Sequence, residues 1–537
     1  MIVNLGLSVS LRWILMGSVL TTSIWFTFLA MYRTKRFFQP RHRNLYEYDS
    51  FSTIPKTSLE RMHEYLQYTD FEDYLLLANI YTSEASVKKT EFKVGDEIKV
   101  DIVLYNGRGE RATVGGDMLR IWLRERSLRA SVAGYVIDHG NGSYTGIVKA
   151  MWTGCPELMF AIGNTKEHIG IFMNIVQKYG VIEFLQAGFR KNNVTVYKLC
   201  SVIPNIPDVK EYCNFTAQNF NMSFFCSKAK DFTCEDWIFY SRSGYRPCKR
   251  EHESFFRNYR YLKKRVTVLN VLKTNKTGSV RSPEISCRDV SSVVTWHTTN
   301  PTGYFLHGRW QSSICKSSLT RYYNTYLECL KDRLVLMTGD STTRNWFVPL
   351  AGLLRLKVMN GEHEIKDKAW QKFAEAVNSS LGVHLYWTPH EIPFYSHEQH
   401  KDNLRSIASR IDELPSNASA IVILHWFGHL TRTTPQQYRE HVRSAKEGVL
   451  RLLKRSPRSA IFIKGPHSFT HSFFVEPFDY LSRVYRQILY EELMDLQHRV
   501  YLIDQWDATV GNENLDIHPT FPSFNEMMLN FVFSFIC

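Results

Sequence analysis

Alternation of apolar and polar residues predicts short β-strands in the first half of the chain. In "EIKVDIVLYN" (97–106) every second residue is apolar, as in a strand with one buried face. "MLRIWLRER" (118–126) alternates again, and a Gly/Asn turn leads into a further strand in "HGNGSYTGIV" (139–148). "ELMFAIG" (157–163) has the same character. We expect an Ig-like β-sandwich over residues 85–190.

The second half of the chain shows a different pattern, with short apolar runs separated by helical periodicity. Apolar residues recur at steps of three and four over 436–453 and 480–496, as in helices that cover a sheet. This alternation predicts an α/β domain with a mostly parallel sheet over residues 295–537. Residues 191–294 have no clear period and are predicted as a Cys-rich connector. The four apolar runs are "LVLMT" (334–338), "AIVILHW" (420–426), "AIFIKG" (460–465) and "VYLID" (500–504).

The beginning of the chain predicts a contact with a membrane. Residues 13–32 contain no charged side chain, and a helix of that length spans about 30 Å, the thickness of a bilayer core. We expect residues 1–43 to be an uncleaved signal anchor, with a cleaved signal peptide as the alternative, and residues 44–84 to be a stem. The basic residues that follow the apolar run favour a cytosolic location for that flank.

Charge, cysteines and glycosylation sequons bear on the compartment. The net charge of +14 makes nucleic acid the first partner to consider. Ten cysteines, none in a CxxC pair, instead indicate disulfides in an oxidising compartment, with the terminal Cys537 among them. We therefore expect a Golgi membrane protein with a lumenal body, or a secreted one, that meets acidic glycans or membranes and no nucleic acid. Seven sequons agree with this: Asn141, Asn193, Asn214, Asn221, Asn275, Asn378 and Asn417.

The stretch "LVLMTGDSTTRNWF" (334–347) contains the first candidate for chemistry. Ser341 follows a predicted strand and opens a helix, which is where open parallel sheets gather function. The first N–H groups of a helix lack partners within it and can bind an oxyanion. The alternative is that "GDS" is a simple helix cap, because Asp and Ser are preferred caps. The nucleophile-elbow pattern G-x-S-x-G is absent.

A serine nucleophile needs a base and an orienting group, and the end of the chain offers both. Asp516 and His518 follow the last predicted strand in "NLDIHP". Both therefore belong to a loop at the sheet edge where Ser341 lies. The alternative for an isolated histidine is an ordinary satisfied polar group.

These segments together resemble a known family. "LMTGDSTTRNW", "VILHWFGH" and "DIHP…FVFSFIC" resemble the PC-esterase half of the neurexophilin and PC-esterase domain (NXPE) family, and "HGNGSYTGIVKAMWTG" resembles its neurexophilin-like half. The resemblance implies an SGNH-hydrolase-like fold and O-acetyl transfer to glycan hydroxyls. It implies Ser341 as nucleophile, His518 as base and Gly428 as an oxyanion donor beside His429. Arg344 would bind an acyl oxygen or an acidic sugar.

The chain departs from the family pattern at the orienting acid. The family signature is Asp-x-x-His, whereas here Asp516 stands only two residues before His518. Asp504 or Asp507, at the end of "VYLIDQWD", are the alternative orienting acids. The oxyanion block "WFGHL" also lacks the asparagine that many SGNH enzymes carry there.

Two functions remain open from the sequence. The first is a serine-dependent O-acetyltransferase or esterase of the secretory pathway that acts on glycan or glycoprotein hydroxyls, acidic sugars included. The second is a catalytically degenerate glycoprotein that acts as an extracellular binding or adhesion ligand. No HExxH, P-loop or GxGxxG occurs, so we expect no metal and no bound cofactor. An acetyl donor, with acetyl-CoA as one option, would be a co-substrate.

Overall fold

The computed structural model describes most of the chain beyond residue 61. The predicted anchor at residues 13–32 lies outside the described part. Among the described residues, no helix is long and apolar enough to cross a bilayer. The described ranges are 62–69, 73–247, 263–274, 279–280, 283–297, 300–360, 363–364, 373–469, 476–519, 521 and 523–537.

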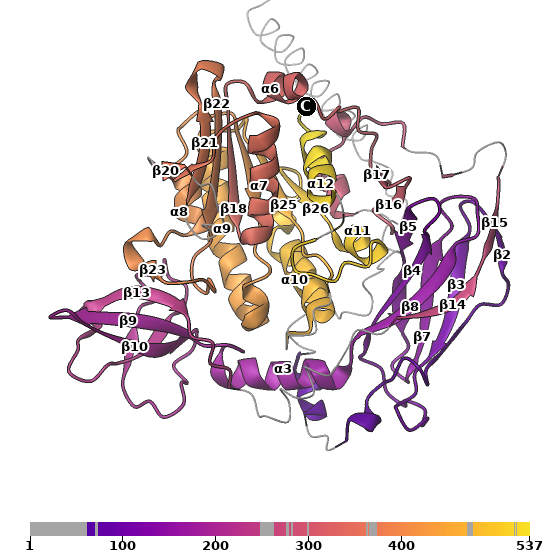
Figure 1. The fold of residues 1–537 in the computed structure, drawn as a ribbon, viewed down its shortest axis with the longest axis horizontal. Coiled ribbons are helices and arrows are strands. Elements are labelled where there is room, and N and C mark those ends of the chain that lie inside the picture. Colours follow the sequence, from indigo (N-terminus) through magenta and orange to yellow (C-terminus); the bar gives the residue numbers. More distant parts are fainter. Residues whose placement is uncertain are drawn as a thin grey trace, which may run out of the picture. The chain divides into compact units, whose positions relative to one another are not determined.

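An antiparallel β-sandwich forms around the strands that alternation predicts (Figure 1). One sheet has the order β1-β3-β7-β6, and the other has the order β14-β8-β4-β5-β16-β17. A parallel pair, β2 and β15, accompanies them. The strands are β1 Glu84–Ser86, β2 Glu91–Lys93, β3 Glu97–Val103, β4 Met118–Glu125, β5 Ala130–Ala133, β6 Tyr135–Asp138, β7 Ser143–Lys149, β8 Glu157–Asn164, β14 Lys263–Val268, β15 Asn270–Leu272, β16 Gly303–Leu306 and β17 Arg309–Ser312.

The core of the sandwich comes from the predicted alternating residues. Ile98, Val100, Ile121 and Phe160 are fully buried between the two sheets. The sandwich nevertheless extends beyond the predicted span of 85–190, because β14, β16 and β17 add to the edges of the second sheet. These three strands are short or poorly alternating, and their register is set by pairing with distant strands, which a local pattern does not reveal.

Residues 166–242 contain elements that alternation did not predict. Helix α3 (Lys166–Tyr179) is followed by a sheet of order β11-β12-β10-β9-β13-β23. Helix α3 and most of β9 lie within the span predicted as sandwich, but neither belongs to the two sandwich sheets. Residues 191–242 of the predicted connector are largely β-structure, stapled by the disulfides Cys200–Cys226 and Cys213–Cys234. The strands are β9 Leu185–Lys191, β10 Val194–Ser201, β11 Tyr212–Asn214, β12 Phe225–Ser227, β13 Trp237–Arg242 and β23 Gln399–His400.

The C-terminal α/β domain has the mostly parallel sheet that the sequence predicts. Its order is β20-β19-β21-β22-β18-β24-β25-β26, and the last five strands run parallel. The four apolar runs named above form β18, β24, β25 and β26. The strands are β18 Arg333–Gly339, β19 Met359–Asn360, β20 His363–Glu364, β21 Ala374–Asn378, β22 Val383–Pro389, β24 Ala420–Leu424, β25 Ala460–Lys464 and β26 Val500–Ile503.

Helices cover both faces of this sheet (Figure 1). Leu336 of β18 packs in one apolar cluster with α8, α9 and α10, whereas its neighbours Val335 and Met337 pack with α6, α7 and α12. The helices are α2 Met62–Tyr65, α5 Ser292–Trp296, α6 Tyr323–Leu330, α7 Ser341–Leu353, α8 Ile407–Asp412, α9 Pro435–Arg455, α10 Phe478–Glu492, α11 Trp506–Gly511 and α12 Phe524–Phe533. Short 3-10 turns occur at Leu66–Tyr68, Tyr74–Leu76, Cys234–Asp236, Cys287–Asp289, Ser379–Leu381, Lys401–Asn403, Leu430–Arg432 and Met494–Leu496.

Two further disulfides belong to the second half of the chain. Cys287 pairs with Cys315, and Cys329 of α6 pairs with Cys537. The prediction of a disulfide at Cys537 is therefore confirmed. Cys155 is free and exposed, and Cys248 lies outside the described residues.

Candidate active site

The site lies where the order of the parallel strands reverses. The chain runs from β18 to β22 on one side and then to β24 on the other, so β18 lies between them. Loops that leave the carboxyl ends at such a point diverge and open a crevice. Gly339 ends β18 at φ +151°, and a Cβ there would lie 2.5 Å from the His425 carbonyl oxygen. Only glycine lets the turn pass so close to the end of β24.

Asp340 builds the turn that carries Ser341. It is the N-cap of α7, and its Oδ1 accepts hydrogen bonds from the Thr342 backbone N–H (2.9 Å) and hydroxyl (2.6 Å). Its backbone carbonyl accepts the N–H groups of Thr343 and Arg344. These bonds engage three of the first four N–H groups of α7, which leaves that of Ser341 directed out of the helix start.

Ser341 and His518 lie together although 177 residues separate them. Ser341 Oγ is 2.6 Å from His518 Nε2. Burial lowers the pKa of His518 below its usual value, against the opposing charges of Asp340 and Asp516. The imidazole is therefore neutral at neutral pH, and in its Nδ1–H tautomer Nε2 accepts the serine proton.

Asp516 organises the backbone of the loop that carries His518. Its Oδ1 accepts the backbone N–H of His518 at 3.1 Å, which closes a tight side-chain turn. Its charge also raises the pKa of the His518 imidazole. The spacing of two residues that departs from the family signature thus gives Asp516 a capping contact with its own loop.

The two alternative acids are engaged in a different network. Asp504 Oδ2 accepts from Arg486 Nε at 2.6 Å, and its Oδ1 accepts the Trp506 backbone N–H. Asp507 accepts the backbone N–H of Thr302 at 2.6 Å, and burial together with the nearby Asp504 raises its pKa to about 6. The expectation that either acid orients His518 is not supported by these contacts, because both carboxylates hold α11 to its surroundings.

Gly428 does not have the free donor that the resemblance implies. Its backbone N–H donates to Asp340 Oδ2 at 2.8 Å, so this group is taken by the cap of α7. A Cβ at this position would lie 2.8 Å from Ile517 Cδ1. Gly428 therefore provides space: it lets the residue before His518 approach the Asp340 turn. The prediction of Gly428 as an oxyanion donor is corrected by this contact.

Arg344 and His429 lie near the Ser341–His518 pair. Arg344 is 9% exposed, its Cζ lies 5.9 Å from the centre of the Trp387 ring, and burial lowers its pKa to about 10. It remains a cation at neutral pH, and its charge lowers the pKa of His518. The His429 ring packs edge-on against Phe394 at 4.4 Å between centroids. Burial, with the nearby His390, lowers the pKa of His429 well below its usual value, so this ring is neutral.

Beneath the site is a buried polar cluster that the sequence analysis missed. Lys464 donates to the Thr342 hydroxyl at 2.7 Å, and burial lowers its pKa to about 7. His425 Nδ1 lies 2.7 Å from the Lys464 carbonyl oxygen, and its Nε2 lies 3.6 Å from Asp340 Oδ2. His467 Nε2 lies 2.8 Å from the Ile517 carbonyl oxygen. The signal available in sequence was a polar residue that closes an apolar strand, as in "AIFIK" and "AIVILH".

The charges of this cluster are set by its burial. Burial lowers the pKa of His425 to about 4 and that of His467 to about 3, so both rings are neutral and donate to carbonyls. Burial by itself would raise the pKa of Asp340, but the nearby His425 and Lys464 and the Thr342 hydrogen bond hold it well below its usual value. Asp340 is therefore an anion that binds the Ser341 turn to the strand ends around it. Within the described residues, no group of three or more His, Cys, Asp or Glu side chains is arranged to hold a metal ion.

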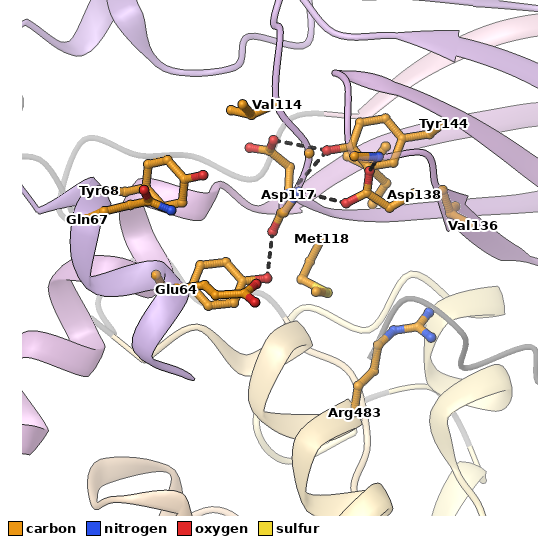
Figure 2. A pocket seen from close by; sticks show the side chains of 15 residues that line it. Glu64, Gln67, Tyr68, Val114, Asp117, Met118, Val136, Asp138, Tyr144 and Arg483 are labelled. Carbon is orange, nitrogen blue, oxygen red and sulfur yellow. Dashed lines mark hydrogen bonds between the residues drawn. The ribbon is translucent and has the colours of Figure 1, made fainter. Parts of the chain in front are cut away.

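A separate pocket of about 310 Å³ lies among α2, the sandwich and α10 (Figure 2). Its lining includes Tyr68, Asp117, Asp138 and Arg483 and none of the predicted site residues. Asp117 and Asp138 accept hydrogen bonds from groups of the pocket wall, as the dashed lines show. The pocket is therefore distinct from the Ser341 site, and its polar groups hold loops of the sandwich together.

Comparison with protein families gives two matches along the chain. Residues 310–537 match the family described as "NXPE family member 4-like, C-terminal domain". Residues 81–256 match the family described as "Neurexophilin". The first match contains both Ser341 and His518, and the second contains most of the sandwich and the small disulfide-stapled sheet.

Proposed function

Because the chain belongs to the NXPE family, we propose that its α/β domain is a serine-dependent O-acyltransferase or esterase of the secretory pathway. The acyl group is acetyl, and the acceptor is a hydroxyl of a glycan or glycoprotein, or water. The observation that carries this proposal is the 2.6 Å contact between Ser341 Oγ and the neutral His518 imidazole.

The proposed reaction has two steps through an acyl-enzyme. Ser341 Oγ attacks the acetyl carbonyl while His518 Nε2 takes its proton, and the proton then passes to the leaving group of the donor. A sugar hydroxyl or water next attacks the acetyl-serine, again with His518 as base, and Ser341 leaves with the proton returned to it. General-base assistance of this kind contributes about 10²–10⁴-fold in rate.

The oxyanion that forms in both steps requires a donor. We propose the backbone N–H of Ser341 as this donor, because it lies at the start of α7, where the positive end of the helix dipole also favours an anion. Gly428 is excluded from the proposed donor set, since its N–H is bound to Asp340. The proposed oxyanion site therefore rests on fewer protein donors than that of many SGNH enzymes.

The position of Arg344 supports an acetyl acceptor or an acetyl donor that carries an anionic group. A guanidinium group pairs well with carboxylates and phosphates, and the burial of Arg344 beside Trp387 weakens competition from water. We propose that Arg344 binds the anionic group of an acidic sugar or of the acetyl donor, acetyl-CoA being one such donor. No bound cofactor is part of this mechanism.

We propose that the protein is anchored in the Golgi membrane by residues 13–32, with its body in the lumen. The alternative is that it is secreted. Four disulfides support an oxidising compartment. Five of the sequon asparagines are exposed, Asn378 is half-buried, and Asn275 lies outside the described residues. The exposed asparagines are Asn141, Asn193, Asn214, Asn221 and Asn417.

The test uses the full chain, an active-site serine probe and an acetyl-transfer assay with a panel of neutral and acidic glycans. We expect the wild type to be labelled at Ser341 and to transfer acetyl groups, and Ser341→Ala to lose both. Ser317→Ala, a change at an exposed serine of the same half of the chain, is the control and keeps wild-type rates. Transfer at the normal rate by Ser341→Ala would refute the proposal.

A second candidate function is a non-catalytic binding ligand, and one observation favours it. The Gly428 N–H is bound to Asp340, so a donor that the resemblance implies for the oxyanion site is missing. In that case the α/β domain keeps the fold of a hydrolase and serves in extracellular binding. The same probe separates the two, because a binding protein leaves Ser341 unlabelled in the wild type and in His518→Ala alike.

A further inference from the structure

Strand β4 of the sandwich turns one face toward the α/β domain. Successive side chains of a strand point to opposite faces. Leu119, Ile121 and Leu123 face the sandwich core, whereas the residues between them contact the α/β domain. Trp122 packs in an apolar cluster with residues of α11, the helix that leads directly into the His518 loop (residues 512–518). The three residues of this outer face are Arg120, Trp122 and Arg124.

The outer face of β4 holds the beginning of the His518 loop through Glu513. Glu513 Oε1 accepts from Trp122 Nε1 at 3.0 Å and from Arg124 Nη1 at 2.5 Å, and its Oε2 pairs with Lys263 of the adjacent β14 region. Burial would raise the pKa of Glu513, but these cations lower it, so the side chain is an anion. Three groups of the sandwich therefore converge on one carboxylate of the loop.

The backbone at Glu513 closes helix α11 and is held locally. Its φ is +53°, and its N–H donates to the Val510 carbonyl at 3.0 Å while the Asn514 N–H donates to the Thr509 carbonyl at 3.0 Å, as in a left-handed helix cap. The side chain, in contrast, has its partners in the sandwich. The sandwich therefore holds the loop at the point where the chain leaves α11.

The same face of β4 reaches the end of the loop by a second route. Arg120 forms a buried ion pair with Asp479 of α10, and Asp479 Oδ1 accepts from the Ser468 hydroxyl. The Ser468 carbonyl accepts from Asn514 Nδ2 at 2.9 Å, and the same amide donates to the Asp516 carbonyl at 2.7 Å. Asp516 in turn accepts the N–H of His518. An unbroken series of polar contacts thus runs from β4 to the histidine.

We propose that strand β4 positions the His518 loop, with Glu513 as the positioning residue, so that the sandwich determines whether the imidazole meets Ser341. This inference deepens the proposed function and rests on it for its catalytic meaning. The sandwich is then part of the catalytic unit and not only a separate binding module. The structural part of the inference, that the sandwich orders residues 512–518, stands without any activity.

The test compares two substitutions in the full chain by amide hydrogen exchange and by the rate of serine-probe labelling. Glu513→Gln keeps the shape and one acceptor of the side chain but removes the charge that Arg124 and Lys263 contact. Arg265→Gln is the matched control, since Arg265 is an exposed cation of β14 that contacts Glu157. We expect exchange over residues 512–518 to rise by about tenfold in Glu513→Gln and to stay unchanged in the control.

Labelling of Ser341 should fall by a similar factor of about ten in Glu513→Gln, with α7 and β18 as protected as in the wild type. Equal exchange in the two variants, or a uniform rise across the α/β domain, would overturn the proposal. If Glu513→Gln fails to fold, Arg124→Gln removes one cation that contacts Glu513 and gives the same comparison. If the wild type is not labelled at all, the proposed function fails while the exchange data still decide the positioning role.

Discussion

Ser341 and His518 meet at one point, but the chain positions them by different means. Ser341 is the first residue of a helix that follows a strand paired on both sides, so regular secondary structure fixes it. His518 lies in an irregular loop beyond α11, where Asp516 accepts the His518 N–H and His467 contacts the carbonyl of the preceding residue, Ile517. Secondary structure next to Ser341 in the chain therefore fixes the hydroxyl, whereas tertiary contacts of a loop fix the imidazole.

This difference indicates which half of the site is more easily disturbed by a single substitution. The geometry of a strand, a capped turn and a helix changes little after a single surface substitution, because many backbone hydrogen bonds maintain it. A loop held by a few side chains can lose its geometry through one change, and a displacement of about 1 Å can cost about 10²-fold in rate. The four predictions below test the contrast, beginning with the largest expected effect.

Removal of the imidazole should abolish the chemistry and leave the fold intact. His518→Ala should lower the rate of Ser341 labelling by about 10³-fold or more, because the serine loses its base. The melting temperature should stay near that of the wild type, since His518 is only half-buried and belongs to a loop. Labelling kinetics and calorimetry on the same preparation check this, and an unchanged labelling rate would contradict it.

Loss of Asp340, the N-cap of α7, should destabilise the part of the fold that carries Ser341. Asp340→Ala removes the acceptor for Thr342 and Gly428 and leaves Lys464 buried without its anion. We expect the free energy of unfolding to fall by about 3–5 kcal/mol, because each buried donor left without an acceptor costs about 1–3 kcal/mol. Asp340→Asn keeps one of the two acceptor oxygens and should lose less, and denaturant unfolding of both variants measures the difference. No loss in Asp340→Asn would mean that the charge has no role, and equal losses in the two variants would mean that the hydrogen bonds have none.

Acid should weaken the cluster beneath the site. His425 titrates at about 4 in the fold and at about 6.5 when unfolded, so below pH 6.5 the unfolded chain binds more protons. Its stabilising contribution is complete above pH 6.5 and is lost as the pH falls through about 4, which amounts to about 3 kcal/mol for this one ring. Denaturant unfolding at pH 7 and pH 4.5 measures the loss. His425→Gln should reduce it, whereas His498→Gln, at an exposed histidine, should not.

The smallest expected effect concerns Asp516. Its charge raises the pKa of His518, so Asp516→Asn should lower that pKa and move the acid limb of the labelling profile to lower pH. Asparagine still accepts the His518 N–H, so the rate at neutral pH should change by about threefold at most. Asp495→Asn, at an exposed aspartate, is the control. A shift toward higher pH would contradict this account of Asp516.

The parts of the molecule that the sequence predicted are those fixed by local periodicity. The alternating strands of the sandwich core and the four apolar runs of the parallel sheet were predicted from their own residues. The position of Ser341 after β18 followed from the same reasoning. Local patterns carry this information because burial of one face or of a whole strand dictates residue type at each step.

The parts that escaped prediction depend on partners far away in the chain. Strand β16 joins the sandwich from beyond residue 300 because its pairing with β5 is a tertiary contact. The engagement of the Gly428 N–H by Asp340 cannot be read from "WFGH", since the acceptor stands 88 residues earlier. Lys464 and His425 look like ordinary polar ends of strands until the fold brings them under one turn.

The two-sided burial of β4 has a consequence for its tolerance of sequence change. Its first six residues are buried on both faces, one face by the sandwich core and the other by the α/β domain. A saturation scan of an ordinary half-buried strand would show permissive sites at every second position. Across residues 118–123 we expect every position to be intolerant of substitution, because each side chain is buried by one of the two domains.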